Sequence, residues 1–322
     1  ELQGTFNTLN HLEVFHIQYN QLHQLPQSIC DIDIDFLSSA NELNSELNLE
    51  QNFFCFNLPG CIELHPESAQ IIGEQDCYGS DLQVVSELLE LNEISGNPAG
   101  WGVWENDRLV ELNMTNQGIS VLPENLGYLA KLRNLNLSYN QIEDIPNSIQ
   151  YLIELDSLDI NNNTLVSLPS GLSELERLSK LDISHNSILN YPTVLDSILT
   201  LNKLILNNNF ISSVSENIND LSNLTNLDIS NNDIGFLPED LSNFTNLIEL
   251  NISNNNLIEI PNTFANFVSI ESIDAQNNSI VNFPNIFEEL INLKEINLSN
   301  NNLVEIDNNL FSGINLEQVD LS

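Results

Sequence analysis

The side chains that most often catalyse reactions or bind metals are few in this chain and form no known catalytic pattern. None of the histidines has a Ser or Cys partner at a spacing typical of nucleophilic catalysis; they are His11, His16, His23, His65 and His185. The sequence also lacks GxSxG, HExxH, GxxxxGK[ST] and GxGxxG, which mark hydrolase, zinc-protease, phosphate-binding and dinucleotide-binding sites. We therefore expect no enzymatic activity and no cofactor.

Three acidic residues near the start of the chain alternate with isoleucines, which brings a calcium-binding loop to mind. They are Asp31, Asp33 and Asp35. An EF-hand loop needs Gly at its sixth position for a sharp turn, and Phe36 occupies that position here. Alternation of acidic and apolar residues instead predicts a strand with one charged face and one apolar face. We therefore predict no metal site.

The four cysteines lie close together in the sequence, at Cys30, Cys55, Cys61 and Cys77. No two of them form the CxxC pair that is common in zinc sites, so disulfides are favoured over a zinc site. Four cysteines can pair in three ways, and the sequence does not choose among them. Disulfides would indicate an oxidising compartment, whereas four free thiols would place the chain in the cytoplasm.

The elements that would position any functional residue come from a repeat of 23 residues with the pattern LxxLxLxxN. The Asn position is held by Asn140, Asn163, Asn186, Asn209, Asn232, Asn255, Asn278 and Asn301, and one period earlier by Gln117. The LxL segment places two side chains on the same face and predicts a short strand in each repeat. Parallel strands need a crossover connection, and a repeat of this length allows only a compact one.

The rest of each repeat follows from backbone chemistry. A Pro followed by apolar residues three and six positions later, as in Pro238, Leu241 and Phe244, predicts a helical or 3₁₀ turn with the Pro at its first position. An Asn amide both donates and accepts, so stacked amides are predicted to satisfy buried backbone groups of the turns above and below. We call the eight asparagines the Asn ladder and predict only a structural role for them.

This repeat resembles that of the leucine-rich repeat family, in its 23-residue form with LP in the return segment, over about two thirds of the chain. The resemblance implies an α/β solenoid, shaped like a horseshoe. It carries a parallel β-sheet on the concave face and short helical, 3₁₀ or extended returns on the convex face. The pattern also appears earlier in degenerate form, around Phe15 and Leu47, so we expect two arrays in series.

These patterns divide the chain into four segments. Residues 1–29 are predicted to end a first array, and residues 30–79 to form its cysteine-containing C-terminal cap, which is similar to caps of bacterial secreted leucine-rich repeat proteins. Residues 80–107 are predicted to cap the second array, and residues 108–322 to form it, with nine full repeats and a truncated tenth. Because no cap shields the last repeat, we expect a fragment of a longer polypeptide.

The predicted cap of the second array contains a helix and two tryptophans. Ser80 and Gln83 have the spacing of a capping box and predict a helix that begins at Ser80. Trp101 and Trp104 are predicted to cover the apolar end of the first repeat, and a ligand-binding Trp pair is the alternative. Helix, loop and Trp in this order, followed by WENDRL, resemble the N-terminal caps of extracellular and bacterial members of the family.

The solvent-facing positions of the predicted sheet form the candidate binding surface. The central position of LxL is a short acid or amide in every repeat except the one that contains Ile205. Most of the scarce basic residues lie on or beside this surface, but aromatic anchors are few, which predicts modest affinity. The candidate binding residues are Arg133, Tyr139, Asp159, Lys180, Asp182, His185, Lys203 and Asp228.

Charge and composition exclude several classes of partner. The 322 residues include 46 Asp and Glu against 7 Lys and Arg, which gives a formal net charge of −39. Such a field disfavours nucleic acid and anionic membranes as direct partners. No apolar run approaches the roughly 18 residues of a membrane-spanning helix, so we expect no direct membrane insertion.

We therefore predict a non-catalytic recognition module of a larger secreted or cell-surface protein, which binds a protein or another macromolecule through the concave face. Three alternatives stay open. The chain could be an acidic structural or adhesive spacer of a surface protein, or an intracellular signalling scaffold. It could also be the sensor part of an enzyme, such as a receptor kinase, whose catalytic domain lies outside this chain.

Overall fold

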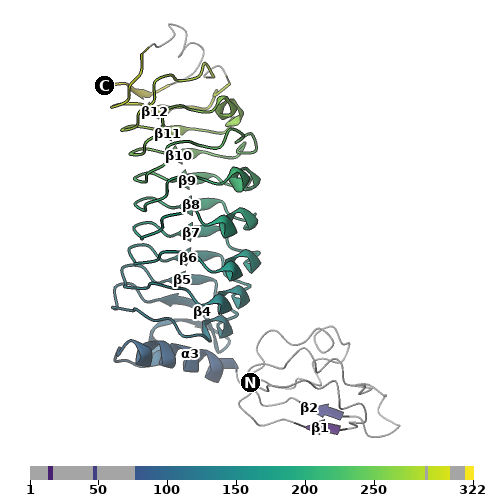
Figure 1. The fold of residues 1–322 in the computed structure, drawn as a ribbon. Coiled ribbons are helices and arrows are strands. Elements are labelled where there is room, and N and C mark those ends of the chain that lie inside the picture. The colour runs from purple at the N-terminus through teal and green to yellow at the C-terminus, as the bar shows by residue number, and fades with distance from the viewer. Residues whose placement is uncertain (1–13, 17–45, 49–76, 287–288, 305–315) are drawn as a thin grey trace.

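The computed structural model describes residues 14–16, 46–48, 77–286, 289–304 and 316–322. From residue 77 onward the described chain winds into a column of stacked coils (Figure 1). Each coil of the array contributes one short strand to a single sheet of 11 strands in the order β13 to β3. From β4 to β13 each strand is parallel to the next one in the sheet, which confirms the predicted solenoid.

The strands of the array recur at the predicted period. They are β4 (Arg108–Asn113), β5 (Asn134–Asn136), β6 (Ser157–Asp159), β7 (Lys180–Asp182), β8 (Lys203–Ile205), β9 (Asn226–Asp228), β10 (Glu249–Asn251), β11 (Ser272–Asp274), β12 (Glu295–Asn297) and β13 (Gln318–Asp320). The register follows the repeat, since Leu158 of β6 pairs with Leu181 of β7 and Leu181 pairs with Leu204 of β8. Because the side-chain period of a strand is two, this register sends one leucine of every coil inward.

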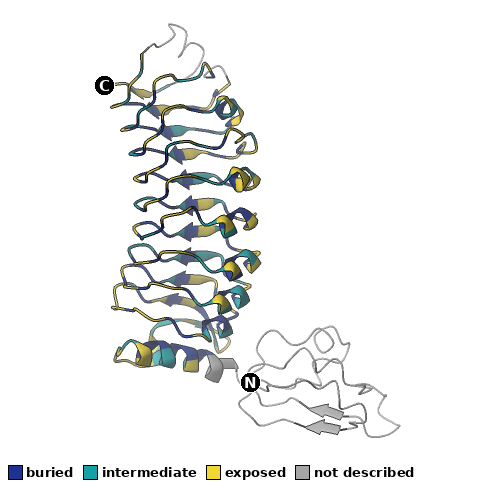
Figure 2. Ribbon diagram, viewed as in Figure 1, coloured by how far each residue is buried: buried dark blue, intermediate teal, exposed yellow. Residues whose placement is uncertain are grey.

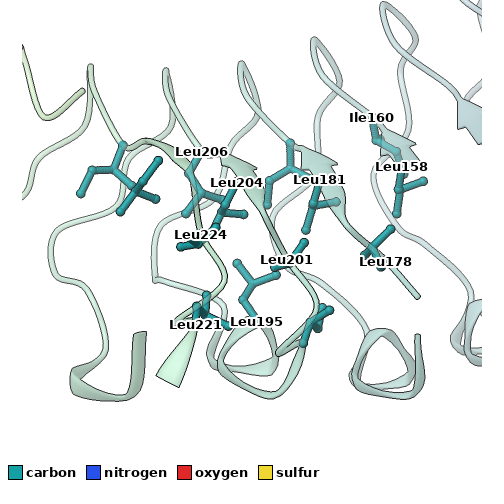
Figure 3. Packing of buried hydrophobic residues seen from close by; sticks show 14 of the residues in the cluster. Leu158, Ile160, Leu178, Leu181, Leu195, Leu201, Leu204, Leu206, Leu221 and Leu224 are labelled. Carbon is teal, nitrogen blue, oxygen red and sulfur yellow. The ribbon is translucent and has the colours of Figure 1, made fainter. Parts of the chain in front are cut away.

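The inward side chains form one continuous core along the column. Leu158, Leu181 and Leu204 are at most 1% exposed, and they pack with Ile160 and Leu178 between the sheet and the returns (Figure 3). Buried residues therefore recur in every coil of the array (Figure 2). Burial of a Leu or Ile side chain contributes about 1.5–3 kcal/mol, so the repeated pattern is the main source of stability.

The Asn ladder ties neighbouring coils together. The Asn163 amide donates to the carbonyl oxygens of Ile160 and Leu137 at 3.1 and 3.0 Å, and its oxygen accepts from the N–H of Ile142 at 2.9 Å. Each ladder Asn thus bonds its own turn and the preceding coil, rather than turns on both sides as predicted, because one amide reaches only one neighbouring coil. Gln117 lies outside this scheme, and its side chain donates to Thr115.

The returns on the other side of the coils are mostly 3₁₀ helices. They are η3 (Leu126–Tyr128), η4 (Asn147–Tyr151), η5 (Ser170–Glu174), η6 (Thr193–Ser197), η7 (Glu216–Asp220) and η8 (Asn262–Asn266). The prediction of Pro at the first helical position is wrong by one residue. Pro146 and Pro261, for example, are extended N-cap residues, where a proline fixes φ before the helix begins.

The return after Pro238 departs from the prediction further, because it forms turns and no 3₁₀ helix. The Asp240 carboxylate there accepts a hydrogen bond from the N–H of Ser242 at 3.0 Å. Side chains such as Asp compete with helical hydrogen bonds in this way. The apolar residues of the segment are still buried, since Leu241 and Phe244 are at most 4% exposed.

The N-terminal end of the column is closed by a helix and a hairpin. Helix α3 (Cys77–Leu91) begins before Ser80, so the predicted capping-box start is wrong. Helix ends fray, so a short spacing signal such as a capping box does not define the first residue of a helix by itself. The short helix η2 (Pro98–Gly100) follows, and then β3 (Gly102–Glu105), an antiparallel strand beside β4 that the sequence analysis did not predict.

Specific contacts fix this cap to the first coil. The Asp81 carboxylate of α3 is fully buried and accepts hydrogen bonds from Arg108 and from the N–H of Leu109, at 2.9 and 2.8 Å. Burial raises the pKa of Asp81, and the Arg108 guanidinium acts in the opposite direction. Trp101 and Trp104 pack against the core of the array, so they occupy the position predicted for capping residues.

Before residue 77 the structure describes only two strands. β1 (Val14–His16) and β2 (Glu46–Asn48) pair in parallel, with Phe15 beside Leu47. The predicted array end at 1–29 and cap at 30–79 otherwise lie outside the described residues, as do Cys30, Cys55 and Cys61. Cys77 is the first residue of α3. Within the described part of the chain, no helix has the length and apolar character needed to span a bilayer.

Candidate functional site

The structure brings the predicted binding residues together on five neighbouring strands, β5 to β9. Asp159, Lys180, Asp182, Lys203 and Asp228 lie in the strands β6 to β9 themselves. Arg133 directly precedes β5, and Tyr139 and His185 follow β5 and β7 by three residues. The candidate site is therefore a continuous stretch of the strand-bearing face, and its members differ in how strongly the surrounding structure holds them.

The central acids and amides of the strands have a structural task that the sequence analysis missed. Asp182 is typical, because its Oδ1 accepts hydrogen bonds from the Ser184 N–H at 3.0 Å and from the Ser184 hydroxyl at 2.7 Å. The same Asx turn closes the strand in all other described coils but one. We call these residues the capping column: Asn113, Asn136, Asp159, Asp182, Asp228, Asn251, Asp274, Asn297 and Asp320.

A signal for this role is present in the sequence. A short acid or amide recurs at the central position and a polar residue often follows two positions later, which is the spacing of an Asx turn. Asp159, Asp182 and Asp228 therefore each commit one oxygen to the backbone. Burial raises the pKa of Asp159 and of Asp228, and the negative charge of Asp182 raises both further.

Ile205 is the exception in the capping column. It pairs with Asp182 on one side and with Asp228 on the other, and it presents a half-buried apolar side chain between them. With Lys203 two residues earlier, strand β8 exposes one cation and one aliphatic group where its neighbours carry polar residues. A shallow hollow on this face is lined in part by Lys203, Ile205 and Asp228.

Lys180 and Lys203, which we call the lysine pair, lie directly beside each other in β7 and β8. Both are exposed, and no carboxylate of the described residues lies within 4 Å of either ammonium group. Two like charges paired across strands destabilise a sheet slightly. The lysine pair therefore costs the folded chain a little stability and is not used for an internal ion pair.

The other basic residues of the array are mostly paired. Ion pairs join Arg108 to Asp81, Lys131 to Glu154, Arg133 to Glu105, and Lys294 to Glu271. The Arg133 guanidinium lies 3.1 Å from Glu105 and 3.8 Å from a second carboxylate, that of Glu154. Arg133 is consequently the least available of the predicted binding cations.

Tyr139 and His185 both have a backbone conformation that is unfavourable for their residue types. Their φ angles are +57° and +52°, in the left-handed region. The equivalent residue of every other described coil has a similar φ and is an asparagine: Asn116, Asn162, Asn208, Asn231, Asn254, Asn277 and Asn300. Asn tolerates this conformation because its side chain bonds locally, whereas other non-Gly residues lose about 1–2 kcal/mol.

The two rings are not compensated by burial. The Tyr139 side chain is 57% exposed, and His185 is also exposed and contacts Asn208 through Nε2 at 3.2 Å. Backbone strain at an exposed, out-of-pattern residue is a pointer to function, since the fold gains nothing from it. Sequence reasoning found both residues from their rings but did not detect the strained backbone.

These residues do not belong to a metal-binding cluster within the described part of the chain. In the described ranges, no group of three or more His, Cys, Asp or Glu side chains is placed to hold a metal ion. The site offers cations, exposed rings, carboxylates and one aliphatic group on a firm sheet. Such a surface can form hydrogen bonds, ion pairs and apolar contacts with a macromolecule.

Coils with one short parallel strand and one ladder Asn each define a leucine-rich repeat solenoid. Two sequence models of that family match the chain. The model described as "Leucine rich repeat" matches residues 130–188 and 222–280, and a second model, also described as "Leucine Rich Repeat", matches residues 292–314. The chain is a leucine-rich repeat protein. No curated protein matches the sequence.

Solved bacterial structures share the fold over nearly the whole chain. A leucine-rich repeat protein of Leptospira interrogans has 20% identity and a TM-score of 0.61, and the match covers 97% of this chain and 69% of that protein. An internalin (inlF) of Listeria monocytogenes has 20% identity and a TM-score of 0.59, over 98% of this chain and 88% of the internalin.

A plant receptor has the same architecture. The ectodomain of the receptor kinase GASSHO1/SCHENGEN3 of Arabidopsis thaliana was solved in complex with CASPARIAN STRIP INTEGRITY FACTOR 2. It has 23% identity to this chain and a TM-score of 0.63, and the match covers 76% of this chain and 35% of the ectodomain. At these identities the likeness of all three structures shows the fold alone.

Proposed function

We propose that the chain is a non-catalytic recognition module of a larger secreted or cell-surface protein and that it binds a protein partner through the strand-bearing, concave face. The observation that carries this proposal is the clustering of departures from the repeat. Tyr139, His185 and Ile205 stand where the other described coils carry Asn or Asp. Lys180 and Lys203 are the only cations at their position of the described strands, and all five residues lie on or beside β5 to β8.

These departures cost stability instead of adding to it. The left-handed backbone at Tyr139 and His185 is strained, and the lysine pair places like charges side by side. A surface that served only as an acidic spacer would have no reason to concentrate such residues in four neighbouring coils. The plant receptor ectodomain, which was solved with a bound factor, is consistent with a partner-binding role.

The test separates binding from stability. The full chain is first used to capture protein partners from a mixture of secreted and surface proteins. The affinity of each captured partner is then measured for the wild type and for the double variant Tyr139→Asn, His185→Asn. We expect the double variant to fold at least as stably as the wild type and to lose most of its affinity. Phe210→Asn is the matched control, because Phe210 is an exposed aromatic residue outside the candidate site. Unchanged affinity in the double variant would refute recognition through this face.

The cellular location and the organisation of the first 79 residues belong to the same proposal. We propose that Cys30, Cys55, Cys61 and Cys77 form disulfides in a cap between two arrays. The second array would then have its own cap at residues 80–107 and its repeats at residues 108–322. Intact mass spectrometry of the native protein without reduction tests this. Two disulfides lower the mass by four hydrogens, whereas four free thiols would place the chain inside the cell.

A further inference from the structure

We propose that the protein partner docks as an acidic, extended segment, with one carboxylate between Lys180 and Lys203 and one aliphatic side chain against Ile205. This inference rests on the proposed function and adds the chemistry of the partner. It is drawn from the only stretch of the described strands where two neighbouring outward residues are cations.

The lysine pair is arranged for a shared carboxylate. The two residues are register partners on adjacent strands, about 4.8 Å apart, so both ammonium groups can donate to the two oxygens of one carboxylate. Their neighbours in the same row are neutral, Ser157 in β6 and Asn226 in β9. An incoming carboxylate would remove the repulsion between the lysines and meet no acid in this row of four strands.

The acidic residues near the lysine pair form hydrogen bonds with other groups of the chain. Asp182 accepts from Ser184, Asp159 accepts from Asn161, and Asp156 accepts from the Ser179 hydroxyl. None of these acids forms an ion pair with the lysine pair among the described residues. The cations are therefore available to a partner, while the capping column beside them limits how many negative charges a ligand can bring.

Ile205 sets the second requirement. It is two residues after Lys203 in β8, so the two side chains point to the same face about 7 Å apart. The same spacing separates side chains i and i+2 of an extended peptide. Because Asp182 and Asp228 flank Ile205, an aliphatic group fits there and a second carboxylate does not. The preferred segment thus has an acid and an aliphatic residue two positions apart.

A random peptide library displayed on phage and selected against the full chain tests this inference. We expect selected peptides to carry Asp or Glu two positions from Leu, Ile or Val. Synthetic copies should bind Lys180→Gln with Lys203→Gln about tenfold more weakly than the wild type, with a further dependence on salt. Lys131→Gln with Lys294→Gln is the matched control, since it changes the net charge equally, and we expect affinity to change less than twofold.

The possible results have distinct meanings. Selected peptides without acidic enrichment, no selected peptides, or equal affinity for the Lys180→Gln, Lys203→Gln variant would each overturn the acidic-segment inference. If Tyr139→Asn with His185→Asn still abolishes partner binding in that case, recognition through this face stands and only the partner chemistry is wrong. If Ile205→Asp and the Lys180→Gln, Lys203→Gln variant each lose affinity, both the aliphatic contact and the carboxylate contact of the inference are supported.

Discussion

The Asn ladder makes a quantitative prediction for Asn186, which is 6% exposed in the middle of the array. Its amide donates to the carbonyl oxygens of Ile160, Ile183 and Ser184 at 3.0–3.1 Å, and its Oδ1 accepts from the N–H of Leu165 at 2.9 Å. Asn186→Ala removes all of these bonds at once. It leaves the Leu165 N–H buried without a partner and weakens the bonding of the three carbonyl groups.

The expected cost follows from desolvation of those groups. A buried donor or acceptor that loses its partner costs about 1–3 kcal/mol, and the carbonyls keep a second lone pair, so we expect a loss of about 2–4 kcal/mol. Gln117→Ala is the matched control. Gln117 holds the same position of the repeat, but its exposed side chain makes one bond, to Thr115, and we expect a loss of less than about 1 kcal/mol.

Two measurements check this prediction. Urea unfolding followed by circular dichroism compares the two variants, and amide hydrogen exchange reports on Leu165 directly. Exchange is needed because long repeat arrays often unfold in steps, which makes a single free energy of unfolding incomplete. The reasoning fails if Asn186→Ala is no more destabilising than Gln117→Ala while the Leu165 amide keeps its wild-type protection.

Three further predictions concern stability. Tyr139→Asn and His185→Asn should each raise the free energy of unfolding by about 1 kcal/mol in thermal or urea unfolding, because Asn relieves the left-handed strain; a loss would contradict this. Gly102→Ala should destabilise by about 1–3 kcal/mol, since a Cβ there would lie 2.3 Å from the Glu111 oxygen, whereas Gly100→Ala meets no atom within 4 Å and should be nearly neutral. Burial raises the pKa of Asp228, so protonation of this carboxylate favours the native state at low pH, and that stabilisation is lost as the pH rises through the raised pKa. Asp228→Asn should therefore be more stable than the wild type at pH 7 but not near pH 3. An equal change in the free energy of unfolding at both pH values would contradict this.

The sequence alone predicted the parts of the fold that repeat. The spacing of inward leucines gives the strands, and the ladder position is visible because Asn163 and Asn186 stand one period apart in otherwise similar surroundings. Repetition works here as internal evidence, since each coil packs only on copies of itself. Repetition cannot predict β3, because this strand occurs once and pairs antiparallel with β4.

The site was predicted by residue but not by role. A central Asp such as Asp182 looks like a free surface acid in the sequence, and only the structure shows its bonds to Ser184. Conversely, the backbone strain at Tyr139 is recognised from its φ angle, which the sequence does not specify. Substitution within a repeat was nevertheless the useful signal, because Tyr139, His185 and Ile205 all stand where other coils carry Asn or Asp.

The bonding of each ladder Asn to its own coil and the preceding one has a mechanical consequence. Strand pairing and the ladder link each coil to its immediate neighbours, and among the described elements of the array none bridges distant coils. A pulling force along the chain would therefore detach coils one after another from an end. Each would release roughly 8 nm of contour length, at about 3.5 Å per residue, so that extension would show a regular series of small steps.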